Sequence, residues 1–244
     1  MNVIRIILVV IWKLWFYFLA IFAMLVLTPF ALIFTFKDSH FPITYKIIRI
    51  WSYIVFFGSG FRYNLIKNTE LKKNQQYIVI SNHTSILDIV LLFIVHPNHL
   101  LTFVGKKELD VVPIFGQIYK RTCILVDRKN FKSRAKVYEL SKEKIKLNRN
   151  IVIFPEGGVP DDTTIVLDKF KDGAFNIAIS ESLPLAIYAI KGLKNSFPFE
   201  FTKGFPAKIV IELIEITPTI SLNESNKEEL KANSFRVIHD NLLK

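Results

Sequence analysis

The stretch Tyr77-Ile-Val-Ile-Ser-Asn-His-Thr-Ser-Ile-Leu-Asp88 decides how this sequence is interpreted. Its first five residues are mostly β-branched or aromatic, which is typical of a buried strand. The polar residues 82–85 predict a turn, and the apolar spacing over 85–95 predicts a helix. In open α/β sheets, reactive side chains gather where strands end. The stretch therefore predicts a strand, a turn and a helix that carry a functional site.

Two side chains of this stretch, His83 and Asp88, suit proton transfer. On an ideal helix, residues five apart point about 140° away from each other, so the two meet only if His83 precedes the helix. The short polar residues Asn82, Thr84 and Ser85 favour that placement, because such residues cap helix N-termini. Asp88 would then hold one imidazole nitrogen and leave the other free to deprotonate an alcohol. Taken alone, the same pair also suits a helix-capping network.

The rest of the chain beyond residue 61 alternates between β-rich runs and helical spacing. This alternation is the signature of an α/β domain built from crossover units. Strands are predicted over residues 77–81, 101–104, 123–126, 151–154, 183–190 and 208–215. Helices are predicted over residues 85–95, 131–146, 173–181 and 228–242.

The amino-acid composition excludes some classes of protein and favours certain partners. The chain has 244 residues, of which 51% are hydrophobic and 22% charged, and this much apolar surface excludes global disorder. A single cysteine, Cys123, excludes an intramolecular disulfide framework and favours a reducing compartment. The net charge of +11 favours anionic partners such as phospholipid head groups, a phosphorylated substrate or an acidic carrier protein.

The N-terminal sixty residues are the most apolar part of the chain. Residues 14–36 carry no charge over 23 positions, which is long enough to span a bilayer, and a second apolar stretch covers residues 43–57. Two membrane hypotheses follow: a spanning helix, or a helical hairpin that enters one leaflet, which we favour. Helices that cap a soluble core are a third alternative. We expect an anchor at residues 1–60 and a catalytic domain at 61–244.

A basic segment covers residues 128–149, with nine Lys and Arg against two Glu. Such a run is often only a solvated helix face, and it also suits anionic lipid or an acidic acyl carrier. Nucleic acid is not expected as a partner, because no binding motif accompanies the charge. A metal is not expected either, since His96 and His99 lie beyond the helix and lack further ligands.

Three cations follow predicted strand ends or precede a helix. Lys106 lies in Gly105-Lys-Lys-Glu-Leu109, and Arg128 ends Ile124-Leu-Val-Asp-Arg128. A guanidinium and an ammonium beside one cleft suit a phosphate, although both residues also fit ordinary loops. Lys171 precedes a predicted helix N-terminus, where an anion is favoured.

The stretch Ile151-Val-Ile-Phe-Pro-Glu-Gly-Gly158 ends a predicted strand at Pro155. The backbone N–H groups of Gly157 and Gly158 are able to form an anion-binding nest. The Glu156 carboxylate suits hydrogen bonds to substrate hydroxyls and equally suits bracing of the loop.

Taken in order, these motifs resemble the bacterial 1-acyl-sn-glycerol-3-phosphate acyltransferase family. The resemblance spans roughly residues 78–190. Its blocks are N-H-x4-D at Asn82, His83 and Asp88, G-K-x-E-L at residues 105–109, P-x-F-G to D-R ending at Arg128, F-P-E-G at residues 154–157, and F-K-x-G-A-F at residues 170–175.

The resemblance implies a mixed central sheet with flanking helices and transfer of an acyl group from a carrier-protein or coenzyme A thioester to a lysophospholipid, without a cofactor. His83 would be the general base and Asp88 its partner, on the cytoplasmic side of the inner membrane. Substrate contacts are expected from Asn82, Ser85, Lys106, Arg128, Glu156, Gly157, Gly158 and Lys171.

One departure from the family pattern concerns the acceptor. Where the family commonly reads F-P-E-G-T-R, this chain has Gly158 and Val159 after F-P-E-G, so the expected arginine is absent. Either Lys106, Arg128, Lys169 or Lys171 supplies the charge, or the acceptor is a lyso-aminolipid such as an ornithine or glycine lipid. A catalytically idle membrane-surface module is the alternative from another class.

Overall fold

A computed structural model describes residues 3–160, 162 and 164–244. It contains a seven-stranded sheet with the order β1-β7-β6-β2-β5-β3-β4. The strands are β1 (Arg62–Lys67), β2 (Ile78–Ser81), β3 (Leu101–Lys106), β4 (Ile124–Val126), β5 (Asn150–Ile153), β6 (Leu185–Lys191) and β7 (Lys208–Thr217). Neighbouring strands are parallel except for β6 and β7, which are antiparallel. The predicted α/β class with a mixed sheet is confirmed.

Strand β2 lies at the centre of the sheet and is buried along its whole length. Its residue Ile80 pairs with Ile153 of β5 on one side and with Ile187 of β6 on the other. A strand that is covered on both faces has apolar side chains at successive positions, and residues 77–80 form such a continuous apolar run. Because these three strands are parallel, their carboxyl ends meet at one edge. The catalytic candidates follow there.

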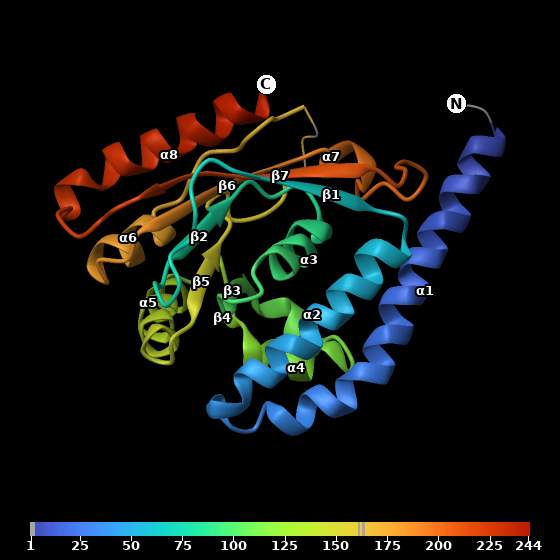
Figure 1. Cartoon of the computed structure of the whole chain (residues 1–244), viewed down its shortest axis with the longest axis horizontal. Coiled ribbons are helices and arrows are strands. Elements are labelled where there is room, and N and C mark those ends of the chain that lie inside the picture. The colour runs from blue at the N-terminus through green and yellow to red at the C-terminus, as the bar shows by residue number, and fades with distance from the viewer. Residues whose placement is uncertain (1–2, 161, 163) are drawn as a thin grey trace.

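Helices cover both faces of the sheet (Figure 1). The helices and 3-10 turns of the α/β region are α3 (Ile86–Val95), η2 (Lys107–Val111), α4 (Phe115–Thr122), α5 (Phe131–Lys146), α6 (Gly173–Ser180), α7 (Leu193–Ser196), η3 (Glu224–Asn226) and α8 (Lys227–Leu242). One buried cluster joins the sheet to α3 and the N-terminal helices. The other joins the opposite face to α5, α6 and α8.

The N-terminal segment is a helical hairpin. Helix α1 (Val3–Phe34) turns through η1 (Asp38–His40) into α2 (Phe41–Gly58), and the pair runs along one flank of the sheet domain (Figure 1). Helix α1 is longer than the predicted charge-free run, because it begins before it and includes Arg5 and Lys13. By length and composition α1 is able to cross a membrane. Only 22% of its most apolar window is buried, unlike a core helix of a soluble protein.

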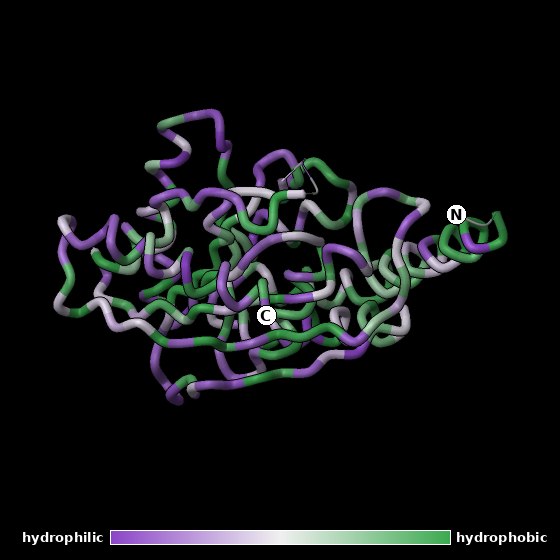
Figure 2. The backbone as a smooth tube through the Cα atoms, turned by 90° about the horizontal axis from the view of Figure 1, so that it is seen from above, coloured by the Kyte–Doolittle hydropathy of each residue, from purple (hydrophilic) through white to green (hydrophobic). Residues whose placement is uncertain are grey.

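Apolar residues dominate this hairpin, as Figure 2 shows by its green colour near the N-terminus. Part of them is nevertheless buried against the rest of the protein. Phe16 of α1 and Tyr45 and Phe56 of α2 belong to the same buried cluster as Leu91 of α3 and Ile211 of β7. The hydrophobic core is therefore continuous across residue 60.

The predicted elements agree with the structure to within two residues at each end. The elements that the prediction missed are β1, α4, α7 and the 3-10 turns. Strand β1 is an edge strand whose side chains are mostly exposed, so it lacks the apolar run that marked the inner strands. Helix α4 has eight residues, which is too short for a clear period.

Candidate active site

The turn between β2 and α3 brings His83 and Asp88 together. Ser85 is the N-cap of α3, and its extended backbone leaves His83 in the lead-in turn, outside the helix. The distance from His83 Nδ1 to Asp88 Oδ2 is 3.0 Å. The geometric condition that the sequence set for this pair is therefore met, while its catalytic role remains a prediction.

The Asp88 carboxylate is fully buried at the helix N-terminus. Its Oδ2 accepts hydrogen bonds from the backbone N–H groups of Thr84 at 2.6 Å and Ser85 at 2.8 Å. These donors and the helix dipole stabilise the charged carboxylate and fix its position. Asp88 thereby orients the imidazole of His83. No described residue hydrogen-bonds the other ring nitrogen, Nε2, of His83.

The loop after β5 supports His83 from the other side. The imidazole stacks on Phe154, with ring centroids 4.0 Å apart and an interplanar angle of 12°. Glu156 Oε1 accepts from the backbone N–H of His83 at 2.7 Å, and Oε2 accepts from that of Asp168 at 2.9 Å. Glu156 thus braces His83, and since it also lines the cavity described below, its contact with a substrate hydroxyl stays a prediction. Phe154 was not a predicted site residue, although it begins the F-P-E-G block.

The environment of Glu156 is unusual for a carboxyl group. Burial raises its pKa to about 7, against the opposing effect of the hydrogen bonds from Asp168 and His83. A carboxyl with a pKa near neutrality therefore accepts directly from the backbone N–H of the candidate base, His83.

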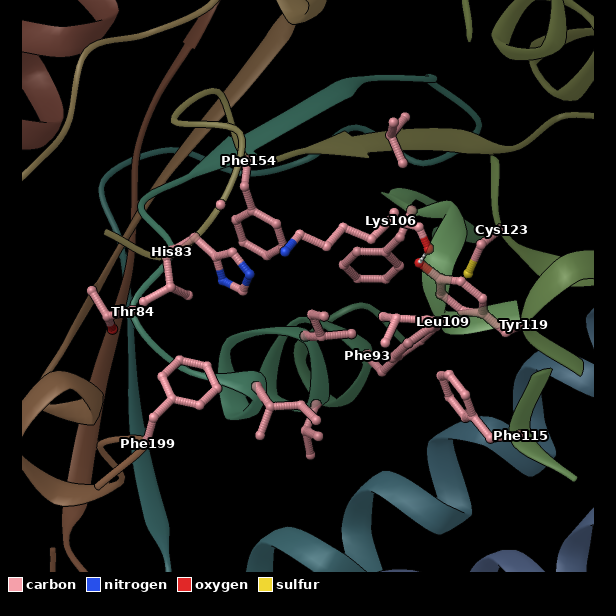
Figure 3. A pocket seen from close by; sticks show the side chains of 18 of the residues that line it. His83, Thr84, Phe93, Lys106, Leu109, Phe115, Tyr119, Cys123, Phe154 and Phe199 are labelled. Atoms are coloured by element: carbon pink, nitrogen blue, oxygen red, sulfur yellow. Dashed lines mark hydrogen bonds between the residues drawn. The ribbon is translucent and has the colours of Figure 1, made fainter. Parts of the chain in front are cut away.

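A cavity of about 990 Å³ opens beside His83 (Figure 3). Its volume lies at the upper end of the range for small-molecule pockets. Apart from the end near His83, its walls are mostly apolar. They include Met24, Leu27, Ala31, Ile47, Trp51, Ile89, Phe93, Phe103, Phe115 and Ile118. Helices α1, α2 and α3 thus build an apolar chamber that leads to the imidazole.

Two of the predicted cations line this cavity. Lys106 extends along it with its ammonium toward His83 and Phe154 (Figure 3). Arg128 is half-buried, and burial lowers its guanidinium pKa from its very high ordinary value. Among the described residues, no carboxylate pairs with Arg128 or Lys106. Both cations are therefore available to an anionic group of a ligand.

The glycine turn of the F-P-E-G block lies between two cations. Gly157 has a φ of +79°, and a Cβ there would lie 2.3 Å from Nζ of Lys171. A Cβ on Gly158 would lie 3.1 Å from Nη1 of Arg128. Gly158 and Val159 line the cavity, whereas Gly157 and Lys171 do not. Arg128 is thus the cation beside Gly158, the residue before Val159, where the family pattern has arginine.

Two predicted substrate contacts, Asn82 and Ser85, are buried and lie outside the cavity lining. The Asn82 amide accepts from the backbone N–H of Ile190 at 2.8 Å and donates to its carbonyl at 2.9 Å. Ser85 accepts from the N–H of Leu87 and donates to the carbonyl of Phe197. Asn82 therefore ties β2 to β6, and Ser85 caps α3.

The basic segment contains several residues with internal partners. Lys144 and Arg149 both pair with Asp38 of the hairpin turn, and Lys142 lies 3.8 Å from Glu181. The Arg134 guanidinium donates to the carbonyl of Arg128. In the described part of the chain, no group of three His, Cys, Asp or Glu side chains is placed to hold a metal ion.

Comparison with known proteins gives consistent matches. The family model described as Acyltransferase matches residues 62–191. The 1-acyl-sn-glycerol-3-phosphate acyltransferase of Helicobacter pylori is 34% identical over 148 residues, 59% of this chain and 61% of that protein. The enzyme of the same name from Cocos nucifera is 30% identical over 68% of this chain and 52% of that protein. This chain therefore matches less than two thirds of the length of these relatives.

One solved structure matches over the whole chain. The crystal structure of the 1-acyl-sn-glycerophosphate (LPA) acyltransferase PlsC from Thermotoga maritima has a TM-score of 0.78 with this chain. The match covers 100% of this chain and 97% of that one at 21% sequence identity. At this identity the likeness demonstrates a common fold, including the N-terminal hairpin.

Proposed function

The chain belongs to the Acyltransferase family, whose model covers residues 62–191, and we propose that it acylates the sn-2 hydroxyl of 1-acyl-sn-glycerol-3-phosphate to form phosphatidic acid. The observation that carries this proposal is the His83–Asp88 pair in the wall of an apolar cavity that also holds two unpaired cations. The similar proteins from Helicobacter pylori and Escherichia coli, both named 1-acyl-sn-glycerol-3-phosphate acyltransferase, support the proposal.

The reaction requires a base and an orienting carboxylate. Nε2 of His83 takes the proton of the acceptor hydroxyl as its oxygen attacks the thioester carbonyl carbon. The tetrahedral intermediate then collapses, the carbon–sulfur bond breaks, and the imidazolium returns the proton to the departing thiolate. Asp88 holds Nδ1–H and stabilises the imidazolium between these steps. No protein nucleophile is needed.

The acceptor phosphate is assigned to the cationic end of the cavity. Lys106 points its ammonium toward His83 (Figure 3), and Arg128 approaches Gly158, two residues after the Glu156 that bonds to the His83 backbone. A guanidinium offers two parallel donors to phosphate oxygens, which suits a terminal phosphate better than a neutral head group. The apolar chamber would receive a fatty chain. The acyl donor, a thioester of acyl carrier protein or coenzyme A, would approach from water.

A one-leaflet anchor agrees best with how α1 is attached. Ten residues after its start, α1 is attached through Lys13, which hydrogen-bonds to the carbonyls of Pro198 and Glu200. Just past its end, Thr35 accepts a hydrogen bond from Arg121 at 2.9 Å. A helix held to the α/β domain at Lys13 and again just past its C-terminal end would lie along the membrane surface and expose its apolar side to lipid. The domain would then face the cytoplasm at head-group depth.

Replacement of the candidate base tests the proposal. With lysophosphatidate and an acyl thioester in membranes, His83→Ala should lower the rate of phosphatidate formation by roughly a hundredfold to ten-thousandfold, the usual contribution of a general base. His99→Ala, which removes an imidazole outside the cavity, is the matched control and should retain activity. Unchanged activity of His83→Ala would exclude the proposed base, and no transfer by the unaltered protein would favour an idle membrane module.

A lyso-aminolipid acceptor is the second candidate, because Val159 lines the cavity where the family commonly has arginine. Both lyso-acceptors should be offered to one preparation, with products identified by mass spectrometry. We expect lysophosphatidate to be acylated. Acylation of the aminolipid alone would show that the loss of the arginine changed the acceptor.

A further inference from the structure

The loop Phe197-Pro-Phe-Glu-Phe-Thr-Lys-Gly-Phe205, here called the aromatic loop, has no role in the chemistry described above. It contains four phenylalanines in nine residues and follows α7. Pro198, Phe199, Glu200 and Lys203 line the cavity, and Figure 3 shows Phe199 on the same side of it as His83. The loop therefore forms one wall of the cavity near the imidazole.

Helix α1 holds the aromatic loop through a buried lysine. Lys13 is 1% exposed, and its Nζ donates to the carbonyl of Pro198 at 2.7 Å and to that of Glu200 at 2.5 Å. The same ammonium lies 5.2 Å from the ring centroid of Phe197 and 5.9 Å from that of Phe201. A charged group in an otherwise apolar helix persists only where it is fully bonded, and here the loop supplies the partners.

Aromatic contacts make the loop continuous with the exposed apolar side of α1. Phe201 stacks on Tyr17 with centroids 6.0 Å apart, and Phe197 packs on Phe16 at 4.3 Å. Gly204, with a φ of +123°, lets the backbone pass close to Trp12 and Ser196. The loop is thus a fixed extension of the hairpin surface.

The loop also contacts the catalytic turn. Ser85, the N-cap of α3, donates from its Oγ to the carbonyl of Phe197 at 3.1 Å. The backbone N–H of Ser85 donates to Asp88, the partner of His83. Two hydrogen bonds therefore separate the loop from the catalytic carboxylate.

The outer surface of the loop has the chemistry of a membrane interface. Phe199 is 72% exposed, and Phe201 and Phe205 are also exposed. Lys203 is exposed beside them. Exposed aromatic rings beside lysine are favoured where hydrocarbon meets head groups, because rings enter the apolar region while ammonium groups stay in water.

We propose that the aromatic loop is a second membrane contact of this protein, forming a lip of the cavity over which the lipid acceptor enters. Its partner is the bilayer that the exposed side of α1 also contacts, since the two surfaces are continuous. Lys13 is a positioning residue that keeps the lip against α1. The role in acceptor entry rests on the proposed function, whereas membrane contact does not.

Membrane contact is tested without activity. In a Cys123→Ala background, Phe199→Cys carries an environment-sensitive fluorophore. Ile220→Cys is the control because Ile220 is similarly exposed, at 81%, lies outside the cavity lining and follows Thr219, which bonds to Ala178 of α6 on the opposite face of the sheet. On insertion into phosphatidylcholine–phosphatidylglycerol vesicles, emission at position 199 should shift to the blue and be quenched by brominated lipid. A label at 199 that remains in water, or equal quenching at 220, would overturn the proposal.

Acceptor entry is tested by kinetics with two acceptors, a long-chain lysophosphatidate in vesicles and a short-chain one dissolved in water. Phe199→Ala should raise KM for the vesicle acceptor roughly tenfold more than KM for the dissolved one, as expected for losing one aromatic ring that the bilayer would bury. Lys13→Met should also raise KM for the vesicle acceptor more than KM for the dissolved one. Lys13→Arg keeps a donor to the loop carbonyls, so its two KM values should stay close to those of the unaltered protein. Ile220→Ala, which changes an exposed residue outside the cavity lining, should match the unaltered protein.

The outcomes separate the two proposals. Equal KM changes for both acceptors would remove the lip from acceptor entry while leaving the acyltransferase proposal intact. If the unaltered protein acylates neither acceptor, the proposed function fails, and the fluorophore experiment still decides whether the loop contacts the membrane.

Discussion

At the scale of single residues, burial and hydrogen bonding act on Glu156 in opposite directions. Burial raises the pKa of its carboxyl to about 7, and the backbone N–H groups of His83 and Asp168 limit that rise. The folded state therefore binds this proton more tightly than the unfolded chain, in which the pKa is near 4.5. The associated stability is complete below that value and is lost as the pH rises toward 7.

Glu156→Gln, which resembles the protonated carboxyl, should remove this pH dependence. Between pH 4.5 and 8, the stability of the unaltered protein should fall by roughly 3 kcal/mol more than that of the variant, at about 1.36 kcal/mol per pKa unit. Thermal unfolding of both proteins across this range, in one detergent, measures the difference. Parallel curves would show that Glu156 titrates at an ordinary pH.

We predict that Arg128 binds the acceptor phosphate at the cationic end of the cavity. Arg128→Gln should raise KM for lysophosphatidate roughly tenfold to a hundredfold, since hydrogen bonds to charged groups contribute about 1.5–3 kcal/mol. For monoacylglycerol, which lacks the phosphate, KM should change less than about twofold. Lys169→Gln is the control, because Lys169 is exposed and lies outside the cavity lining. Equal losses with both acceptors would remove Arg128 from phosphate recognition.

At the scale of elements, the turn between α1 and α2 is fastened to the α/β domain by charge. Asp38 pairs with Arg149, which is buried before β5, and lies 3.3 Å from Lys144 of α5. The Arg149 guanidinium also lies 3.5 Å from the ring centroid of Phe41, at the start of α2. This contact sets the position of the hairpin relative to the sheet, and therefore the walls that α1 and α2 give the cavity.

Asp38→Asn should destabilise the protein because it leaves Arg149 buried without a counter-charge. Loss of a partner from a buried pair costs about 3–5 kcal/mol, and the half-exposed position of Asp38 reduces this to roughly 1–2 kcal/mol. Thermal unfolding in detergent should show a Tm lower by several degrees. Glu70→Gln, which breaks the exposed pair with Lys67, is the control and should leave the Tm nearly unchanged. A Tm equal to the control would contradict this role.

At the scale of the whole molecule, the N-terminal hairpin and the α/β region share one core. Phe16, Tyr45 and Phe56 are buried against residues of α3 and the sheet. The proposed boundary at residue 60 thus separates two proposed functions, membrane attachment and catalysis, but it does not separate two hydrophobic cores. Removal of the hairpin would expose the apolar face of α3 and one side of the sheet to water.

A chain of residues 61–244 should consequently fail to unfold cooperatively, in contrast to the full-length protein. Circular dichroism in the near ultraviolet, followed during heating, measures the presence of fixed aromatic packing. The full-length protein in detergent is the reference. A sharp cooperative transition of the fragment would demonstrate an independent domain and contradict the shared core.

Local sequence was sufficient for much of the fold and for the catalytic turn. The apolar run before residue 82 and the capping residues after it predicted β2, the turn and α3, because strand burial and helix capping depend on near neighbours. Edge strand β1 escaped prediction because its partner β7 lies about 140 residues later, and only that pairing makes 62–67 a strand.

The sequence by itself determined the family and the apolar N-terminal segment, and its capping residues favoured a position of His83 outside the helix that carries Asp88. Only the tertiary structure decided that Asn82 and Ser85 are internal supports, that Glu156 braces His83, and that the aromatic loop is bonded to Lys13. The physical reason is that periodicity and capping act over a few residues. The partners of a buried polar atom are chosen by packing between segments as far apart as α1 and the loop after β6.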